Sequence, residues 1–214
     1  MRSQHQQNSA LIFYLIGKKT GGGSGEIVTP SGDWNTIVTD TVSGYLPWDK
    51  QIQNAVNVNN FFKEKGWALT PRMALLGNMT GESTINPGLI EVGGGTTSDG
   101  PGRGLVQWTP GTALLKVLDV LYGGHADWSD GNKQLAAMWA EYEEASGLAN
   151  RGIEKQWYAT SAYPISYAEW AHDTSHNLDW LVYAFMANYL RPATLDHPER
   201  VTYANQWANH FIKG

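Results

Sequence analysis

The chain has 214 residues, of which 16% are charged, and its formal net charge is -5. This balance excludes the broad basic face that binding to a nucleic-acid backbone normally requires, so we expect no nucleic-acid partner. Cysteine is absent, which excludes disulfides, Cys-ligated zinc sites and cysteine nucleophiles. The ten tryptophans and ten tyrosines are many for this length, and their faces suit either a packed core or stacking against neutral, hydroxyl-rich ligands such as sugars.

Residues 1–47 predict an N-terminal arm rather than a folded unit. The apolar run 10–16 is too short to span a bilayer of about 30 Å, and its flanks are not typical of a signal peptide. A glycine-rich linker follows at 21–25, and residues 34–39 then alternate β-prone side chains. We expect no membrane span and no signal peptide here, and either an attachment or packing arm or a flexible tail. Residues 48–214 then form one domain.

The rest of the chain predicts a mainly α domain, because apolar residues recur with helical spacing in six or seven segments. The first segment starts near Asp49 and ends at a glycine stop, Gly66. Helix starts are indicated by two threonine–proline pairs and two capping-box pairs: Thr70-Pro71, Thr109-Pro110, Ser166/Glu169 and Asp196/Glu199. Further helical patterns lie at 135–146 and 178–190, and a glycine-rich segment, 93–104, interrupts the series.

Glu82 is the first candidate for chemistry. On the helix predicted over 71–83, it shares one side with Leu75 and Met79, because these positions are spaced by four and three. Apolar neighbours disfavour the charged carboxylate and raise its pKa, and the negative end of the helix dipole acts in the same direction. A raised pKa suits a general acid, which must hold its proton near neutral pH. The alternative is an ordinary surface glutamate at a helix end.

Several short motifs around Glu82 resemble the phage tail lysozyme family, whose members are peptidoglycan-cleaving domains of phage tails. They are Gly77-Asn78, Glu82-Ser83, Asn86-Pro87 and the run Gly104-Leu105-Val106-Gln107-Trp108-Thr109. The run from Phe185 to Pro192, with Arg200 and Trp207, is similar to the closing helices of that family. The resemblance covers residues 52–211, and it extends more distantly to goose-type lysozymes and bacterial lytic transglycosylases.

The resemblance implies a lysozyme-like fold, mainly α (α+β), with a helical lobe and a small β-hairpin lobe. It implies Glu82 as the general acid at the junction of the lobes, and Gln107 as a cleft residue that bonds the sugar. The implied partner is bacterial peptidoglycan, and the implied location is the virion tail, with other tail proteins as candidate partners of the arm.

The second catalytic group is left open by two departures from the related patterns. Thr109 stands where goose-type enzymes carry an aspartate, and Leu190 stands where the tail lysozymes have an acidic residue. Glycoside hydrolysis usually needs two carboxyl groups. Asp99, in the glycine-rich segment, is the first candidate for base or water-positioning group, and Glu91 is the second. A mechanism that needs Glu82 alone, as in transglycosylases, is the remaining alternative.

Other residues near the motifs have two interpretations each. Trp108 either stacks on a sugar or fills the lobe junction, and Thr109 either caps the helix after Pro110 or holds a water beside the cleft. Glu91 is also a candidate substrate-binding residue. Arg103 either meets a carboxylate of the substrate or is a solvated loop arginine.

His172 and His176 lie four positions apart without a third ligand at a zinc-site spacing, so we expect no metal and no cofactor. The leading hypothesis is a muramidase. A lytic transglycosylase is the nearest alternative, and a non-catalytic tail or wall-binding protein with a lysozyme-like fold is the third.

Overall fold

The computed structural model describes residues 31–94, 100–147 and 152–213. The apolar run, the glycine linker of the arm and Asp99 therefore lie outside the described residues. Within them the chain is mainly helical, as predicted, with seven α-helices. These are α2 (Trp48–Glu64), α3 (Leu69–Ser83), α4 (Thr112–Tyr122), α5 (Gly131–Ala145), α6 (Tyr167–Ala171), α7 (Leu178–Phe185) and α8 (Pro198–Lys213). A 3-10 helix, η1 (Val42–Gly44), precedes them, and a π-helix, η2 (Met186–Leu190), continues α7.

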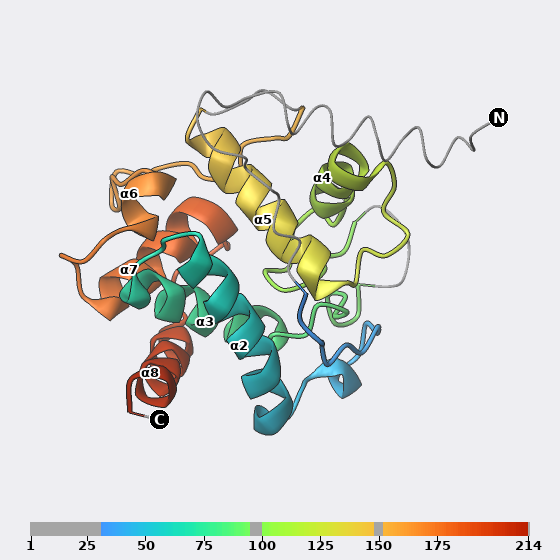
Figure 1. Cartoon of the computed structure of the whole chain (residues 1–214), viewed down its shortest axis with the longest axis horizontal. Coiled ribbons are helices and arrows are strands. Elements are labelled where there is room, and N and C mark those ends of the chain that lie inside the picture. The colour runs from blue at the N-terminus through green and yellow to red at the C-terminus, as the bar shows by residue number, and fades with distance from the viewer. Residues whose placement is uncertain (1–30, 95–99, 148–151, 214) are drawn as a thin grey trace.

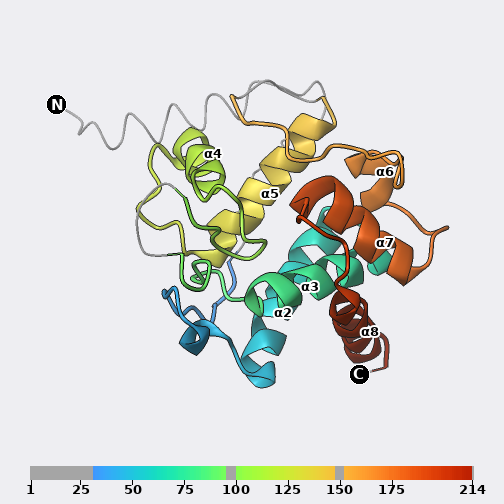
Figure 2. The same ribbon diagram turned by 180° about the vertical axis from the view of Figure 1, so that it is seen from behind.

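Helix α3 is the centre of the fold. It packs against α2, α6, α7 and α8, and the residues from Pro71 to Thr80 are all buried (Figures 1 and 2). Helix α8 crosses α3 closely, because a Cβ atom added at Gly77 would lie only 2.6 Å from the Ala204 Cβ atom and from the Arg200 carbonyl oxygen. Only glycine allows this approach, so Gly77 fixes the position of α8 on the core helix.

The predicted β-hairpin lobe is not present in the described residues. Three isolated bridges occur in its place: Thr39 with Leu89, Ile90 with Arg103, and Arg103 with Trp108. The physical reason is that the chain leaves the extended conformation here, since Gly93, Gly104 and Gln107 have positive φ angles of 78°, 80° and 48°. Side-chain amides bond some of the backbone groups nearby. Leu105 N donates to Gln134 Oε1 at 2.8 Å, and Leu89 O accepts from Gln107 Nε2 at 3.0 Å.

Helix stops and starts were predicted with unequal success. Gly66 has a φ of +81° directly after the C-cap of α2, and the Trp67 N–H bonds back to Phe62 O at 2.9 Å, so the predicted glycine stop is confirmed. The capping box of Ser166 and Glu169 at the start of α6 is also confirmed.

The threonine–proline pairs do not cap helices. Helix α3 begins at Leu69 with Ala68 as N-cap, and α4 begins at Thr112 with Gly111 as N-cap. Thr109 donates its hydroxyl proton to Gln107 O at 2.9 Å instead, so its interpretation as a cap is wrong. The Asp196 cap is wrong as well, because α8 begins at Pro198. In each case the local pattern lies within three residues of the true start.

The described part of the arm, residues 31–47, is bonded to the helical body by buried asparagines. Asn86, which is fully buried, bonds Ile37 through both its amide oxygen (3.1 Å) and its amide nitrogen (2.8 Å), and it also donates to Gly44 O at 2.9 Å. Asn54 bonds the N–H and C=O groups of Asn35 at 2.9 Å each. Of the two interpretations of the arm, packing therefore holds for these residues.

Replacing Asn86 by alanine should destabilise the protein by about 3 kcal/mol, because several buried backbone groups lose their partner. Urea unfolding followed by circular dichroism measures the loss. Asn205→Ala is the matched control, since this exposed amide bonds only Val201 O of its own helix and its removal should cost within about 0.5 kcal/mol. Equal stability of the two variants would contradict this role of Asn86.

Candidate active site

Glu82 lies in the last turn of α3 and forms an ion pair with α8. Its Oε1 atom is 2.7 Å from Arg200 Nη1, and the two side chains are 17% and 6% exposed, respectively. The Glu82 side chain is thus largely buried but keeps partial exposure to solvent.

Two opposing effects act on the Glu82 carboxyl group. Burial raises its pKa above the ordinary value, while the positive charge and hydrogen bond of Arg200, and then the charge of His197, lower it. Burial is the larger effect, so the net pKa is raised. The direction and its main cause agree with the apolar stripe predicted from Leu75 and Met79, which are both fully buried.

Arg200 is held in place by Asn78, one turn before Glu82 on α3. Its Nη1 atom donates to Asn78 Oδ1 at 3.3 Å, and the Asn78 amide nitrogen donates to Val182 O of α7 at 3.2 Å. The sequence did not identify this partner of Glu82. The sequence does contain a signal, however, because Arg200, Ala204 and Trp207 share one face of α8. An arginine on a face that is otherwise apolar is expected to have a buried partner for its charge.

The helix end and the Gly-Leu-x-Gln motif meet directly. Ser83 is fully buried, and its hydroxyl donates to Leu105 O at 2.9 Å. Gln134 of α5 accepts from Leu105 N and donates to Pro87 O at 2.7 Å. Gly104 has a φ of +80°, and a Cβ atom there would lie 2.5 Å from Gln134 Oε1, so this position requires glycine. The motifs that carry the family resemblance therefore form one bonded unit, to which Gln134 is an unpredicted contributor.

Gln107 is partly buried in the loop 104–109. Its backbone is in the left-handed region, with a φ of 48°, and its Nε2 atom donates to Leu89 O and Gly104 O at 3.0 Å each. The amide nitrogen is used inside the loop. Among the described residues no donor is bonded to the amide oxygen, which remains the group that can accept a bond from a ligand.

The other predicted residues lie in different surroundings. Trp108 is 3% exposed, which leaves no ring face for a sugar and favours its interpretation as core filler. Glu91 is exposed, and its carboxylate accepts from Gly102 N at 3.0 Å. Arg103 is only 5% exposed and lies 5.1 Å from the Trp128 ring centre, so the interpretation as a solvated loop arginine is wrong. Thr109 is exposed, and Asp99 lies outside the described residues.

Glu141 of α5 is a fully buried carboxyl group that the sequence did not single out. It accepts hydrogen bonds from Trp108 Nε1 at 2.9 Å and from the Tyr189 hydroxyl group. Burial raises its pKa to about 7, while these two bonds and the charge of Arg191 act in the opposite direction. Burial from solvent excludes Glu141 from direct contact with a ligand.

The two histidines are engaged elsewhere. His172 Nε2 lies 3.2 Å from the Tyr142 hydroxyl oxygen, and His176 Nδ1 lies 2.8 Å from Asp173 Oδ2. No group of three metal-ligating side chains occurs within the described ranges. Over the same ranges, no helix has both the length and the apolar character needed to cross a membrane.

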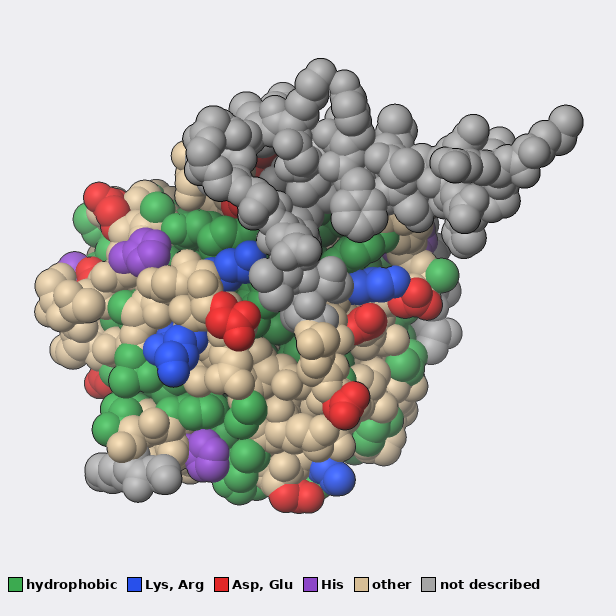
Figure 3. Space-filling view, in the orientation of Figure 1, with side chains coloured by type: hydrophobic (Ala, Val, Ile, Leu, Met, Phe, Trp, Pro, Cys, Tyr) green, Lys and Arg blue, Asp and Glu red, His purple; other side chains and the backbone are tan. Residues whose placement is uncertain are grey.

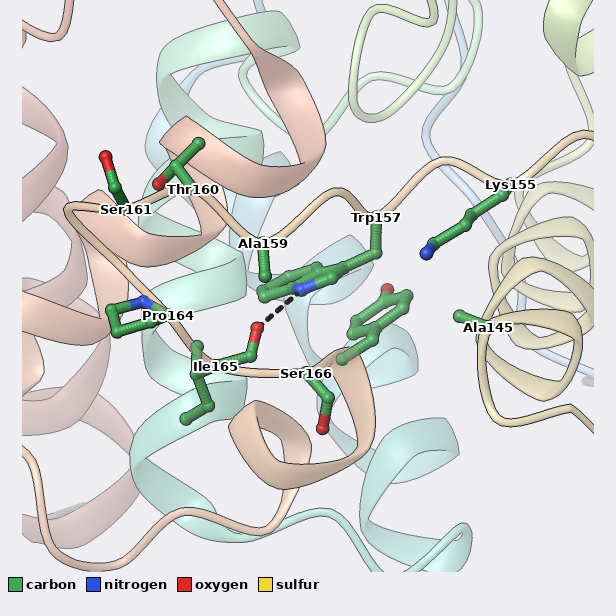
Figure 4. A pocket seen from close by; sticks show the side chains of 10 residues that line it. Ala145, Lys155, Trp157, Ala159, Thr160, Ser161, Pro164, Ile165 and Ser166 are labelled. Carbon is green, nitrogen blue, oxygen red and sulfur yellow. Dashed lines mark hydrogen bonds between the residues drawn. The ribbon is translucent and has the colours of Figure 1, made fainter.

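A separate pocket of about 380 Å³ lies between the end of α5 and residues 155–167 (Figure 4). None of the predicted site residues lines it. Its Trp157 donates from Nε1 to Ile165 O at 2.9 Å, and its Thr160 and Ser166 hydroxyl groups are bonded to Asn188 and Glu169, respectively. These lining groups are thus already bonded within the fold.

On the face seen in Figure 3, Lys and Arg side chains lie scattered among Asp and Glu side chains.

The raised pKa of Glu141 predicts a pH dependence of stability. A folded-state pKa of about 7, against the ordinary 4.5, means that the folded protein binds this proton more tightly than the unfolded chain. The contribution of Glu141 to stability is therefore greatest below pH 4.5 and falls by about 3 kcal/mol as the pH rises through 7. Urea unfolding between pH 4 and 8 measures the free energy of unfolding of the wild type and of Glu141→Gln. The difference between the two proteins should change over this pH window, and a constant difference would contradict the raised pKa of Glu141. The exposed Glu154→Gln variant should follow the wild type.

Comparison with known proteins connects these motifs to a family. The phage tail lysozyme family matches residues 53–211, a range that holds Glu82, the loop 104–109, Glu141 and Arg200. The chain is also similar to Morphogenesis protein 1 of Bacillus phage B103, with 33% identity over 166 residues, which is 77% of this chain and 41% of that protein. The chain thus spans about two fifths of the length of this relative. By the extent of the family match, the chain belongs to the phage tail lysozyme family.

Proposed function

We propose that the chain is a muramidase-type glycoside hydrolase that cleaves the β-1,4 glycan of bacterial peptidoglycan, and that it acts from a phage virion tail. The observation that carries the proposal is Glu82: a partly exposed side chain whose carboxyl group has a raised pKa, in the last turn of the core helix, where Ser83 bonds the Gly-Leu-x-Gln loop. Membership of the tail lysozyme family supports peptidoglycan as the substrate class.

In this proposal Glu82 protonates the oxygen of the glycosidic bond as that bond breaks. Burial raises the pKa of Glu82, which is the direction that a general acid requires. Arg200, 2.7 Å away, then stabilises the carboxylate that remains after proton transfer. In this proposal the Gln107 amide oxygen accepts a hydrogen bond from a sugar hydroxyl group, since the amide nitrogen is bonded within the loop.

We retain Asp99 as the proposed second group, which acts as base or positions the attacking water. A separation of about 5–5.5 Å from Glu82 would correspond to retention of configuration, and about 6.5–9.5 Å to inversion. Glu91 is less suited to this role, because its carboxylate already holds the Gly102 N–H group. This engagement of Glu91 is also what supports the alternative of a lytic transglycosylase that uses Glu82 alone.

A non-catalytic tail protein is the third candidate, since the relative from phage B103 carries the name of a morphogenesis protein. Tight glycan binding without new glycan ends would distinguish it from both enzymes.

Glu82→Gln should lower the rate of wall clearing by at least about a hundredfold, because the amide cannot donate the catalytic proton. Turbidity of a wall suspension measures the rate, circular dichroism checks the fold, and Glu154→Gln serves as the matched control. Mass spectrometry of the wild-type products identifies the reaction, since new reducing ends indicate hydrolysis and 1,6-anhydro ends indicate a transglycosylase. Full activity of a folded Glu82→Gln protein would refute the proposal.

Arg200→Gln should move the alkaline fall of the pH–rate profile upward by about one pH unit or more, because loss of the cation raises the Glu82 pKa further. The maximal rate should fall as well, because the carboxylate formed in the reaction loses its partner. Arg200→Lys should keep the alkaline fall closer to the wild-type position. Lys155→Gln, which removes an exposed lysine charge, is the control. An unchanged alkaline fall in folded Arg200→Gln would show that Glu82 and Arg200 are not coupled.

A further inference from the structure

Glu141 has no part in the proton transfer proposed for Glu82, yet it lies directly behind the loop that carries Gln107. It is fully buried on α5, and both of its carboxyl oxygens are bonded. A buried carboxylate costs stability unless its bonds repay the loss of solvent. An apolar residue at this core position would avoid that cost. The presence of a carboxyl group here therefore indicates that its two hydrogen bonds have a role beyond stability.

The first bond reaches the loop. Trp108 follows Gln107, and its indole N–H group donates to Glu141 Oε1 at 2.9 Å. The Trp108 backbone is paired with Arg103 on the other side of the loop, with N···O distances of 3.1 and 3.3 Å. Backbone and side chain of Trp108 are therefore both fixed, the side chain by Glu141.

Gln107 depends on this fixation. A left-handed backbone conformation is unfavourable for a residue other than glycine, and it persists only where the surroundings impose it. Gln107 has this conformation, with a φ of 48°. On its N-terminal side, Gly104 is packed against Gln134, and on its C-terminal side Trp108 is bonded to Glu141.

The second bond of Glu141 connects it to the π-helix η2. The Tyr189 hydroxyl group donates to Glu141 Oε2, and Tyr189 belongs to the π-helix η2, which continues α7. Helix α7 in turn packs against α3 and α8, which carry Glu82 and Arg200. One carboxyl group thus joins the loop 104–109 to the helices that hold the proposed acid.

We propose that Glu141 is a positioning residue that sets the conformation of Gln107 through Trp108 and fixes the loop relative to η2 through Tyr189. The inference rests on the proposed function for its effect on turnover, but its effect on the loop does not. Changes at Glu141 should therefore alter glycan binding at Gln107 although Glu141 touches no substrate.

The wild-type protein provides the first test, by NMR between pH 5 and 9. The Trp108 indole N–H resonance should titrate with Glu141, and the Gln107 backbone amide should follow with the same midpoint. Charged and titratable groups that face Glu141 are Tyr189 and Arg191 from the C-terminal side and Tyr167 from α6. Glu141→Gln should abolish both titrations. A Gln107 amide that stays fixed while Trp108 titrates would overturn the proposal.

The second test is a double-mutant cycle of Glu141→Gln and Trp108→Phe, which remove the acceptor charge and the indole donor. Each should lower kcat/KM for wall fragments about tenfold, mainly through KM. The double variant should be no worse than the poorer single variant, because both act on the same bond, which Glu141→Gln weakens and Trp108→Phe removes. Effects that multiply to about a hundredfold, or single variants with wild-type kcat/KM, would contradict a shared positioning role.

The two proposals fail in different ways. An inactive wild type, or an active Glu82→Gln protein, would remove the muramidase assignment but would leave the linked titration of Trp108 and Gln107 intact. Loss of that linkage in an enzyme that still requires Glu82 would remove the role of Glu141 alone. Glu154→Gln is the control in both tests, since this exposed carboxylate pairs with Lys116 on the surface.

Discussion

The described backbone groups of residues 86–94 and 100–105 are paired without a regular β-sheet, and amide side chains contribute to this pairing. Asn86, Gln107 and Gln134 each bond two or more backbone groups from separate segments. Each unpaired buried group would cost about 1–3 kcal/mol, so these amides decide whether the segment has one conformation. The loop 104–109 can then take a shape that no regular ladder allows, including the left-handed Gln107.

The proposed acid depends on this framework from one side and on α8 from the other. Ser83 ties the end of α3 to Leu105, while Gly77 lets α8 approach closely enough for Arg200 to reach Glu82. The pKa of Glu82 therefore depends on opposing effects, which arise from its burial and from a residue distant in sequence. Burial in the core helix raises it, and a cation 118 positions later in the chain restrains the rise.

Much of this could be predicted from local patterns. The stripe of Leu75, Met79 and Glu82 follows from helical spacing alone, and the Ser166 capping box needs only four residues. Thr70 and Thr109 misled because a threonine–proline pair is a weak local preference, which tertiary packing overrides. The hairpin lobe was implied by the family resemblance alone, and the local pattern did not indicate the positive φ angles of Gly104 and Gln107 that interrupt an extended strand.

Contacts between distant segments were beyond such patterns. Nothing near Glu82 in the sequence indicates Arg200, and nothing near Trp108 indicates Glu141, since each pair meets only once the helices are packed. Trp108 left two interpretations open at the sequence level, and only its burial distinguished them. Charged or polar residues on an otherwise apolar helix face, such as Arg200 on α8, were the one available signal.

The asparagine bonds to the arm also define what counts as a folding unit. The family match begins at residue 53, inside α2. A fragment cut there would leave the buried Asn86 amide facing the empty places of Ile37 and Gly44, and it would remove the Trp34 ring from Gly131, where an added Cβ atom would lie 2.2 Å from that ring. Boundaries for expression or domain grafting are therefore better drawn to keep residues 34–44, which these contacts join to the helical body, than at the start of the family match.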